Sequence, residues 1–254
     1  MLTLLLATAA FAAQDVTVET SDGLQLHALV HGEQNTSRGV VLVHMEDRKG
    51  SDWSFVAERL GRSGMRTIAP DLRGHGTSPG ADQVNPDDFL PMMEDVRASV
   101  AWLRAQGIED VSCAGAGIGA NLCIRVASED PQISNLVLLS PGLKVKGVGA
   151  LDVVEAYGGR PILLVASSDD RYSAISAEKL EARAKGQKQL EMLAKAGHGT
   201  KMLTRDPALE GIVIEWLLGQ YTLASGEAIA PKDQLQSDVN GIQTTGRTLD
   251  SREK

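Results

Sequence analysis

The residues with the clearest chemical meaning form a glycine-rich turn, Gly115-Ala116-Gly117-Ile118-Gly119, between a short apolar strand and the start of a helix. In the Gly-x-Ser-x-Gly pattern, a turn of this kind holds a serine nucleophile at the exposed end of a strand. Both outer glycines are present here, but the centre is Gly117, which has no side chain. The turn therefore predicts a framework for nucleophilic chemistry that lacks the attacking atom.

No neighbouring side chain is placed to replace the serine. Ser112 and Cys113 lie earlier on the strand, and Asn121 lies a helical turn later. In a serine protease, removal of the nucleophile costs about 10⁶ in kcat and leaves about 10³–10⁴ over the reaction in water. Efficient serine hydrolysis is therefore not expected. Glycine also adopts the strained conformation of such a turn freely, so the fold should be undisturbed.

The elements that would position this turn alternate between apolar runs and amphipathic segments. This alternation predicts an α/β fold with a mostly parallel central sheet and helices on both faces. An antiparallel hairpin, 16–19 and 24–30 around Asp22-Gly23, should lead into it. The span 140–160 leaves no room for a large lid domain. We expect strands at 39–44, 66–70, 110–115, 133–139, 161–166 and 189–194, and helices at 53–63, 86–106, 176–185 and 207–221, with a short helix near 151–156.

The two ends of the chain differ from this pattern. Residues 1–13 form an apolar stretch that is too short to span a bilayer, which needs about 20 residues. The stretch contains a small-residue cleavage pattern, Ala10-Phe11-Ala12, so we expect a signal peptide and export to the periplasm or medium. An apolar segment packed on a cytoplasmic protein is the alternative. The folded domain should span 14–221, and the polar segment 222–254 is expected to be a flexible tail.

Composition excludes several kinds of partner. The net charge of −8 and the absence of a basic stripe argue against nucleic acid. No stable membrane span is expected, and the oligomeric state stays open. Cys113 and Cys123 could be oxidised in an exported protein. Both lie in segments that should be buried, so we expect two free thiols that act as small hydrophobes. Two cysteines without suitably spaced histidines make no zinc site, and no metal or cofactor is predicted.

Several motifs occur in the order used by one fold family. His44-Met45 ends the first parallel strand, and Asp71-Leu72-Arg73-Gly74-His75-Gly76-Thr77-Ser78 follows the next one. The glycine-rich turn comes third, Asp169-Asp170-Arg171-Tyr172-Ser173 fourth and Gly197-His198-Gly199 last. Over 16–221 the chain resembles the α/β-hydrolase superfamily, in particular small bacterial esterases, monoacylglycerol-lipase-like proteins and dienelactone-hydrolase-like proteins. That fold uses the order nucleophile, acid, histidine.

The resemblance implies a role for each matched residue. A serine hydroxyl needs an imidazole to take its proton, and a carboxylate must hold that imidazole in the correct tautomer. His198 would be the base and Asp170 its orienting acid, with Asp169 the less favoured acid. The backbone amides of Met45 and Ile118 would form the oxyanion hole.

Other polar residues have simpler interpretations. Arg73 and His75 should hydrogen-bond neighbouring loops, and His75 receives no catalytic role. His27 and His31 on the hairpin should face solvent. Glu46, Asp47 and Arg48 are either ordinary loop charges or ligand contacts.

Three functional hypotheses follow. The first is a catalytically impaired hydrolase relative that binds a small ester, acyl or carboxylate ligand near Gly117. The second is an enzyme in which a His198–Asp170 dyad activates water directly. The third is a protein whose binding surface lies elsewhere and involves the tail.

Overall fold

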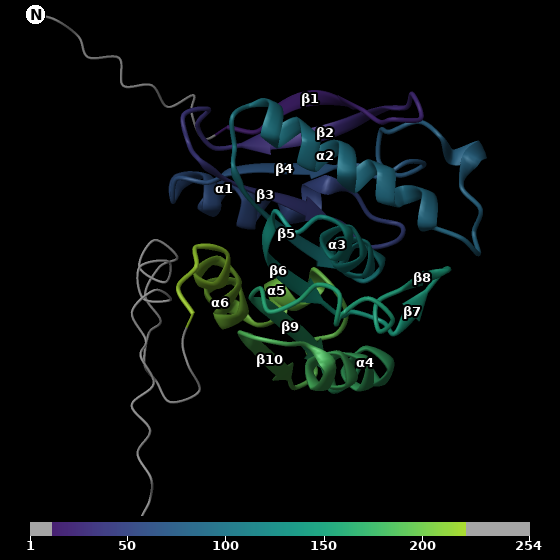
Figure 1. Cartoon of the computed structure of the whole chain (residues 1–254), viewed down its shortest axis with the longest axis vertical. Helices are drawn as coiled ribbons and strands as arrows, with labels where there is room; N and C mark the ends of the chain where they lie inside the picture. Colours follow the sequence, from purple (N-terminus) through teal and green to yellow (C-terminus); the bar gives the residue numbers. More distant parts are fainter. Residues whose placement is uncertain (1–11, 222–254) are drawn as a thin grey trace, which may run out of the picture. The chain divides into compact units, whose positions relative to one another are not determined.

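The chain folds around one mixed sheet of eight strands (Figure 1). The computed structural model describes residues 12–221, and the compact unit ends at Leu217. The strand order is β1-β2-β4-β3-β5-β6-β9-β10. Strands β4, β3, β5, β6, β9 and β10 run parallel, whereas β1 pairs with β2, and β2 with β4, in antiparallel fashion. The mostly parallel sheet and the N-terminal antiparallel hairpin predicted from sequence are thereby confirmed.

The inner strands are uniformly buried, as expected of parallel strands covered on both faces. The strands are β1 (Gln14–Glu19), β2 (Gln25–His31), β3 (Arg38–Val43), β4 (Arg66–Pro70), β5 (Asp110–Ala116), β6 (Ile133–Leu139), β7 (Lys144–Val145), β8 (Val148–Gly149), β9 (Ile162–Ser167) and β10 (Lys188–Leu193).

Helices cover both faces of the sheet. Figure 1 shows α1 and α6 on one side and α2, α3 and α4 on the other. The α-helices are α1 (Ser54–Arg62), α2 (Met93–Ala105), α3 (Ile118–Glu129), α4 (Arg171–Arg183), α5 (Lys201–Arg205) and α6 (Pro207–Leu217). Short 3-10 helices precede α1 (η2, Gly50–Trp53), follow β4 (η3, Ala81–Gln83) and precede α2 (η4, Leu90–Met92).

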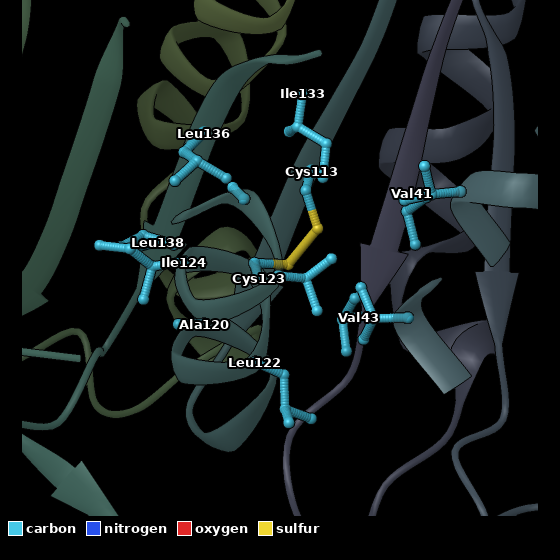
Figure 2. Close-up of a cluster of buried hydrophobic side chains, with 14 of the residues drawn as sticks. Val41, Val43, Cys113, Ala120, Leu122, Cys123, Ile124, Ile133, Leu136 and Leu138 are labelled. Atoms are coloured by element: carbon cyan, nitrogen blue, oxygen red, sulfur yellow. A yellow bond between two sulfur atoms is a disulfide. The ribbon is translucent and has the colours of Figure 1, made fainter. Parts of the chain in front are cut away.

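The two cysteines correct one expectation. Cys113 on β5 and Cys123 on α3 are joined by a disulfide, with Cα atoms 5.8 Å apart. Figure 2 shows this bond within the buried apolar cluster, near Val43 and Leu122. The prediction of free thiols was wrong because α3 follows the turn directly and packs back along β5, which brings the two Cα atoms within disulfide range.

Some helices begin at other residues than the sequence predicted. Helix α2 begins at Met93 rather than near residue 86, and α4 begins at Arg171 rather than near 176. The α4 start moves because the Asp170 carboxylate caps it by accepting a hydrogen bond from the Ser173 amide, at 3.3 Å. Residues 151–156 form turns instead of a short helix.

The hairpin histidines do not both face solvent as expected. His31 is buried, with 5% of its surface exposed, because β2 packs against α1. His27 is partly buried and bridges two carboxylates, Asp15 at 2.7 Å and Asp71 at 3.2 Å.

The segment between β6 and β9 carries only the short β7–β8 hairpin, in keeping with the absence of a large lid. No helix within residues 12–221 is long and apolar enough to cross a membrane. Most of the predicted signal peptide and the whole predicted tail lie outside the described residues.

Candidate active site

The candidate site lies where the order of the sheet reverses. From β3 the chain first adds β4 on one side and then β5 on the other, so the carboxyl ends of β3 and β5 form a topological switch point. Open α/β sheets bind ligands at such a point. A cleft of about 300 Å³ opens there, and its lining includes Met45, Gly117, Ile118 and His198. Four of the five residues that the sequence places in the site thus line this cleft, and the fifth, Asp170, contacts His198 from outside the lining.

Gly117 has the backbone geometry of a turn that presents a side chain. Its φ is 54° and its ψ is −120°, outside the regions that side-chain-bearing residues prefer. A Cβ atom at this position would lie 3.0 Å from His198 Nε2 and 3.0 Å from Met45 Cβ. The imidazole therefore faces the position from which a serine side chain would project, and it stands slightly too close for one.

The outer glycines of the turn are required by close packing. A Cβ on Gly115 would lie 2.2 Å from the Gly119 carbonyl oxygen, and one on Gly119 would lie 2.5 Å from the carbonyl oxygens of Val43 and His44. Glycine at these two positions lets α3 approach β5 and β3 closely. The turn thus keeps the steric requirements of the motif while its central residue has no functional group.

Asp170 is the acid that contacts the histidine. Its Oδ2 lies 2.5 Å from His198 Nδ1, and its Oδ1 accepts the Ser173 amide at the start of α4. Burial opposes ionisation of the Asp170 carboxyl, but hydrogen bonds from Ser173 and His198 outweigh it and hold the pKa below its usual value. An ionised Asp170 fixes the tautomer with the proton on Nδ1, which leaves Nε2 directed at Gly117 as an acceptor.

Asp169 and two serines that the sequence did not single out, Ser140 and Ser167, hold the loop around His198. The amide of Ala196 donates to Ser167 Oγ at 2.7 Å, that of Gly197 to Asp169 Oδ1 at 3.1 Å and that of Gly199 to Ser140 Oγ at 2.9 Å. Ser167 also donates to Asp169. Asp169 thus supports the histidine loop and is not the acid in contact with His198. The sequence signal for both serines was their position, since Ser140 directly follows the apolar strand β6 and Ser167 is the last residue of β9.

His44 fixes the segment that contains Met45. Its Nε2 accepts the Leu72 amide at 2.9 Å, so its proton is on Nδ1, which donates to the Met45 carbonyl at 2.8 Å. Burial lowers the pKa of His44 to about 4, which keeps the ring neutral. Met45 follows β3 and Ile118 is the first residue of α3. Both line the cleft beside Gly117, so their amides lie at the edge where an oxyanion hole would form.

The remaining predicted polar residues lie around this centre. Arg73 forms ion pairs with Asp22 and with Asp95, each at 2.7 Å. The Nδ1 atom of His75 donates to the Arg73 carbonyl. Neither Arg73 nor His75 is among the residues that line the cleft. Glu46 and Asp47 do line the cleft, and Glu46 pairs with Lys146 at 3.5 Å. Arg48 instead pairs with Asp52. Within residues 12–221 no group of three or more His, Cys, Asp or Glu side chains is arranged to hold a metal ion.

Known proteins are similar to parts of this chain in sequence. The family model described as serine aminopeptidase, S33, matches residues 34–159. A lipase of Mycobacterium tuberculosis, LipV, is 31% identical over 139 residues, which cover 54% of this chain and 50% of LipV. A serine hydrolase-like protein of Dictyostelium discoideum is 23% identical over 49% of this chain and 34% of its own length. The matched regions thus span half or less of these relatives.

Solved structures agree on the fold. The Pyrococcus furiosus esterase Pf2001 superposes with a TM-score of 0.67 at 18% identity, covering 82% of this chain and 92% of the esterase. The dienelactone hydrolase of Anabaena variabilis gives 0.68 at 17% identity, covering 82% of this chain and 97% of the hydrolase. The chain belongs to the α/β-hydrolase superfamily and is related to esterases and lipases.

Proposed function

We propose that this protein is a catalytically impaired α/β hydrolase that binds a small ester, acyl or carboxylate ligand. The observation that carries this proposal is Gly117, which has the turn geometry of a nucleophile position without a nucleophile, facing His198 Nε2. A covalent acyl intermediate cannot form on a residue with no side chain.

The cleft beside Gly117 suits a single carboxylate or ester group. The N-terminus of the 12-residue helix α3 points its partial positive charge at this position. His198 Nε2 faces the same position. A volume of about 300 Å³ stands at the small end of ligand pockets, which favours small ligands.

Calorimetry with short carboxylates tests this proposal. The protein should bind acetate and butyrate, and Gly117→Trp should abolish binding because the indole fills the cleft. Gly107→Trp is the matched control, since Gly107 also has a positive φ but its missing side chain would meet open space. Absence of binding by the unaltered protein, or equal binding by both variants, would overturn the proposal.

A second candidate is direct activation of water by the dyad. The contact of 2.5 Å between Asp170 and His198 favours it, because an oriented imidazole is a competent general base. Slow ester hydrolysis should then disappear in His198→Ala. Ester hydrolysis that persists in His198→Ala would refute the hypothesis that His198 and Asp170 activate water.

A further inference from the structure

Tyr172 places an exposed aromatic ring beside the cleft. It is the second residue after Asp170, in the first turn of α4, and 52% of its surface is exposed although it lines the cleft with Gly117 and His198. Among the described lining residues it is the one with a phenyl-type ring. A large exposed ring at a cleft wall is suited to contact a ligand.

The hydroxyl group of Tyr172 fixes the ring in place. It donates to the Lys144 carbonyl at 2.9 Å and accepts the Lys144 amide at 3.2 Å. These bonds tie the ring to the β7–β8 hairpin. Gly142 packs against it closely, because a Cβ there would lie 2.9 Å from Tyr172 Cε1. The ring is therefore presented in one orientation before a ligand arrives, which lowers the entropy lost on binding.

Apolar side chains line the cleft together with the Tyr172 ring. Met45, Ile118 and Val145 contribute apolar side chains, and a methionine thioether contacts aromatic rings favourably. His198 and Ile118 line the same cleft, the first with an imidazole and the second with the first backbone amide of α3. The cleft thus combines polar groups that suit a carbonyl or carboxylate group with apolar side chains and one aromatic ring.

We propose that the cleft selects ligands with one aromatic ring attached to the carboxylate or ester group, and that Tyr172 determines this preference. This inference rests on the proposed function and names its ligand class. The cleft volume of about 300 Å³ accommodates a single ring, since a cavity of about 150 Å³ is enough to bind benzene.

Calorimetry with three probes tests the ring preference. Benzoate has the ring, cyclohexanecarboxylate has similar size without aromaticity, and acetate reports the carboxylate end alone. The protein should bind benzoate most tightly. Tyr172→Leu should weaken benzoate binding about five- to tenfold and leave acetate binding unchanged. Tyr172→Phe keeps the ring and should retain most of the affinity for benzoate. Phe55→Leu removes a similarly exposed ring from α1, outside the cleft lining, and should have no effect.

The outcomes separate the two proposals. Equal binding of benzoate and cyclohexanecarboxylate, or benzoate binding unaffected by Tyr172→Leu, would overturn the ring preference and leave carboxylate binding intact. Equal weakening of acetate and benzoate by Tyr172→Leu would also overturn it, because the change would then act on the whole cleft. If none of the three probes binds, the proposed function fails together with this inference.

Discussion

At the scale of single residues, Gly117 leaves the turn without a functional group and without backbone strain. Its φ of 54° and ψ of −120° cost a side-chain-bearing residue about 1–3 kcal/mol, whereas glycine adopts them without penalty. In the Gly-x-Ser-x-Gly turn a serine accepts such strain, which exposes its hydroxyl group. This chain avoids the strain, while Asp170 and His198 keep the contact that would activate a serine.

His44 gives the stability of the protein a defined pH dependence. Its pKa is about 4 in the folded protein and about 6.5 in an unfolded chain, so only the unfolded state binds the proton between these values. The contribution of neutral His44 is full above pH 6.5 and is lost as the pH falls towards 4, by up to about 3 kcal/mol. Urea unfolding at several pH values should show this loss in the unaltered protein and a smaller one in His44→Gln. Parallel pH curves for the two proteins would contradict the assignment.

At the scale of elements, the apolar runs of the sequence were enough to predict the sheet. Strands β3, β4, β6 and β9 lie within a residue or two of their predicted positions because their side chains are buried on both faces. Helix starts were harder to predict, since α4 begins at the capping contact of Asp170 with Ser173. The disulfide and the hydrogen bonds that Ser140 and Ser167 make to the His198 loop depend on how separate segments pack together. The spacing of apolar residues along the sequence does not predict such packing.

The Cys113–Cys123 disulfide should stabilise the turn that contains Gly117. The two residues are ten positions apart, and closing a loop of this length in the unfolded chain corresponds to about 3 kcal/mol. The double variant Cys113→Ala/Cys123→Ala should lose about this much unfolding free energy in chemical denaturation. A reductant added during unfolding should destabilise the unaltered protein similarly and leave the variant unchanged. Equal stability with and without the bond would contradict this role.

Asn121 connects α3 to the cleft wall. Its side chain is fully buried, donates to the carbonyls of Gly142 and Val148 at 2.9 and 2.8 Å and accepts the Gly142 amide at 2.9 Å. Asn121→Leu leaves these backbone groups without partners and should cost about 2–4 kcal/mol. Hydrogen exchange of the β7–β8 hairpin should accelerate as well. Asn135→Leu, which breaks a buried contact to the Trp216 carbonyl, is the control. It should destabilise the protein without a selective effect on the hairpin, and the same selective effect in both variants would refute the connection.

At the scale of the whole molecule, the fold by itself does not decide the function. Neighbours below 20% identity share the architecture, but a common fold supports many chemistries. The four matched positions Met45, Ile118, Asp170 and His198 could be found from sequence because each follows a predicted strand or opens a helix. Tyr172 could not be assigned a role in this way, since its contact with Lys144 brings together α4 and a hairpin that periodicity does not predict.

We propose that the protein is exported, and the buried disulfide supports this, because such bonds persist mainly in oxidising compartments. N-terminal sequencing of protein recovered from the periplasm or medium should find the chain beginning at Ala13, after the small-residue pattern Ala10-Phe11-Ala12. Recovery of exported protein that still begins at Met1, or retention of the protein in the cytoplasm, would contradict export by cleavage at this position.

The central claim is that the machinery around the missing nucleophile is still assembled. Burst kinetics of Gly117→Ser with an activated short-chain ester test it most directly, alongside urea unfolding. The unaltered protein should show no burst. The serine variant should lose about 1–3 kcal/mol of unfolding free energy to backbone strain. It should also gain a burst that approaches one product per chain and disappears when His198→Ala is added. A folded Gly117→Ser protein without a burst, or a burst in the unaltered protein, would contradict the account.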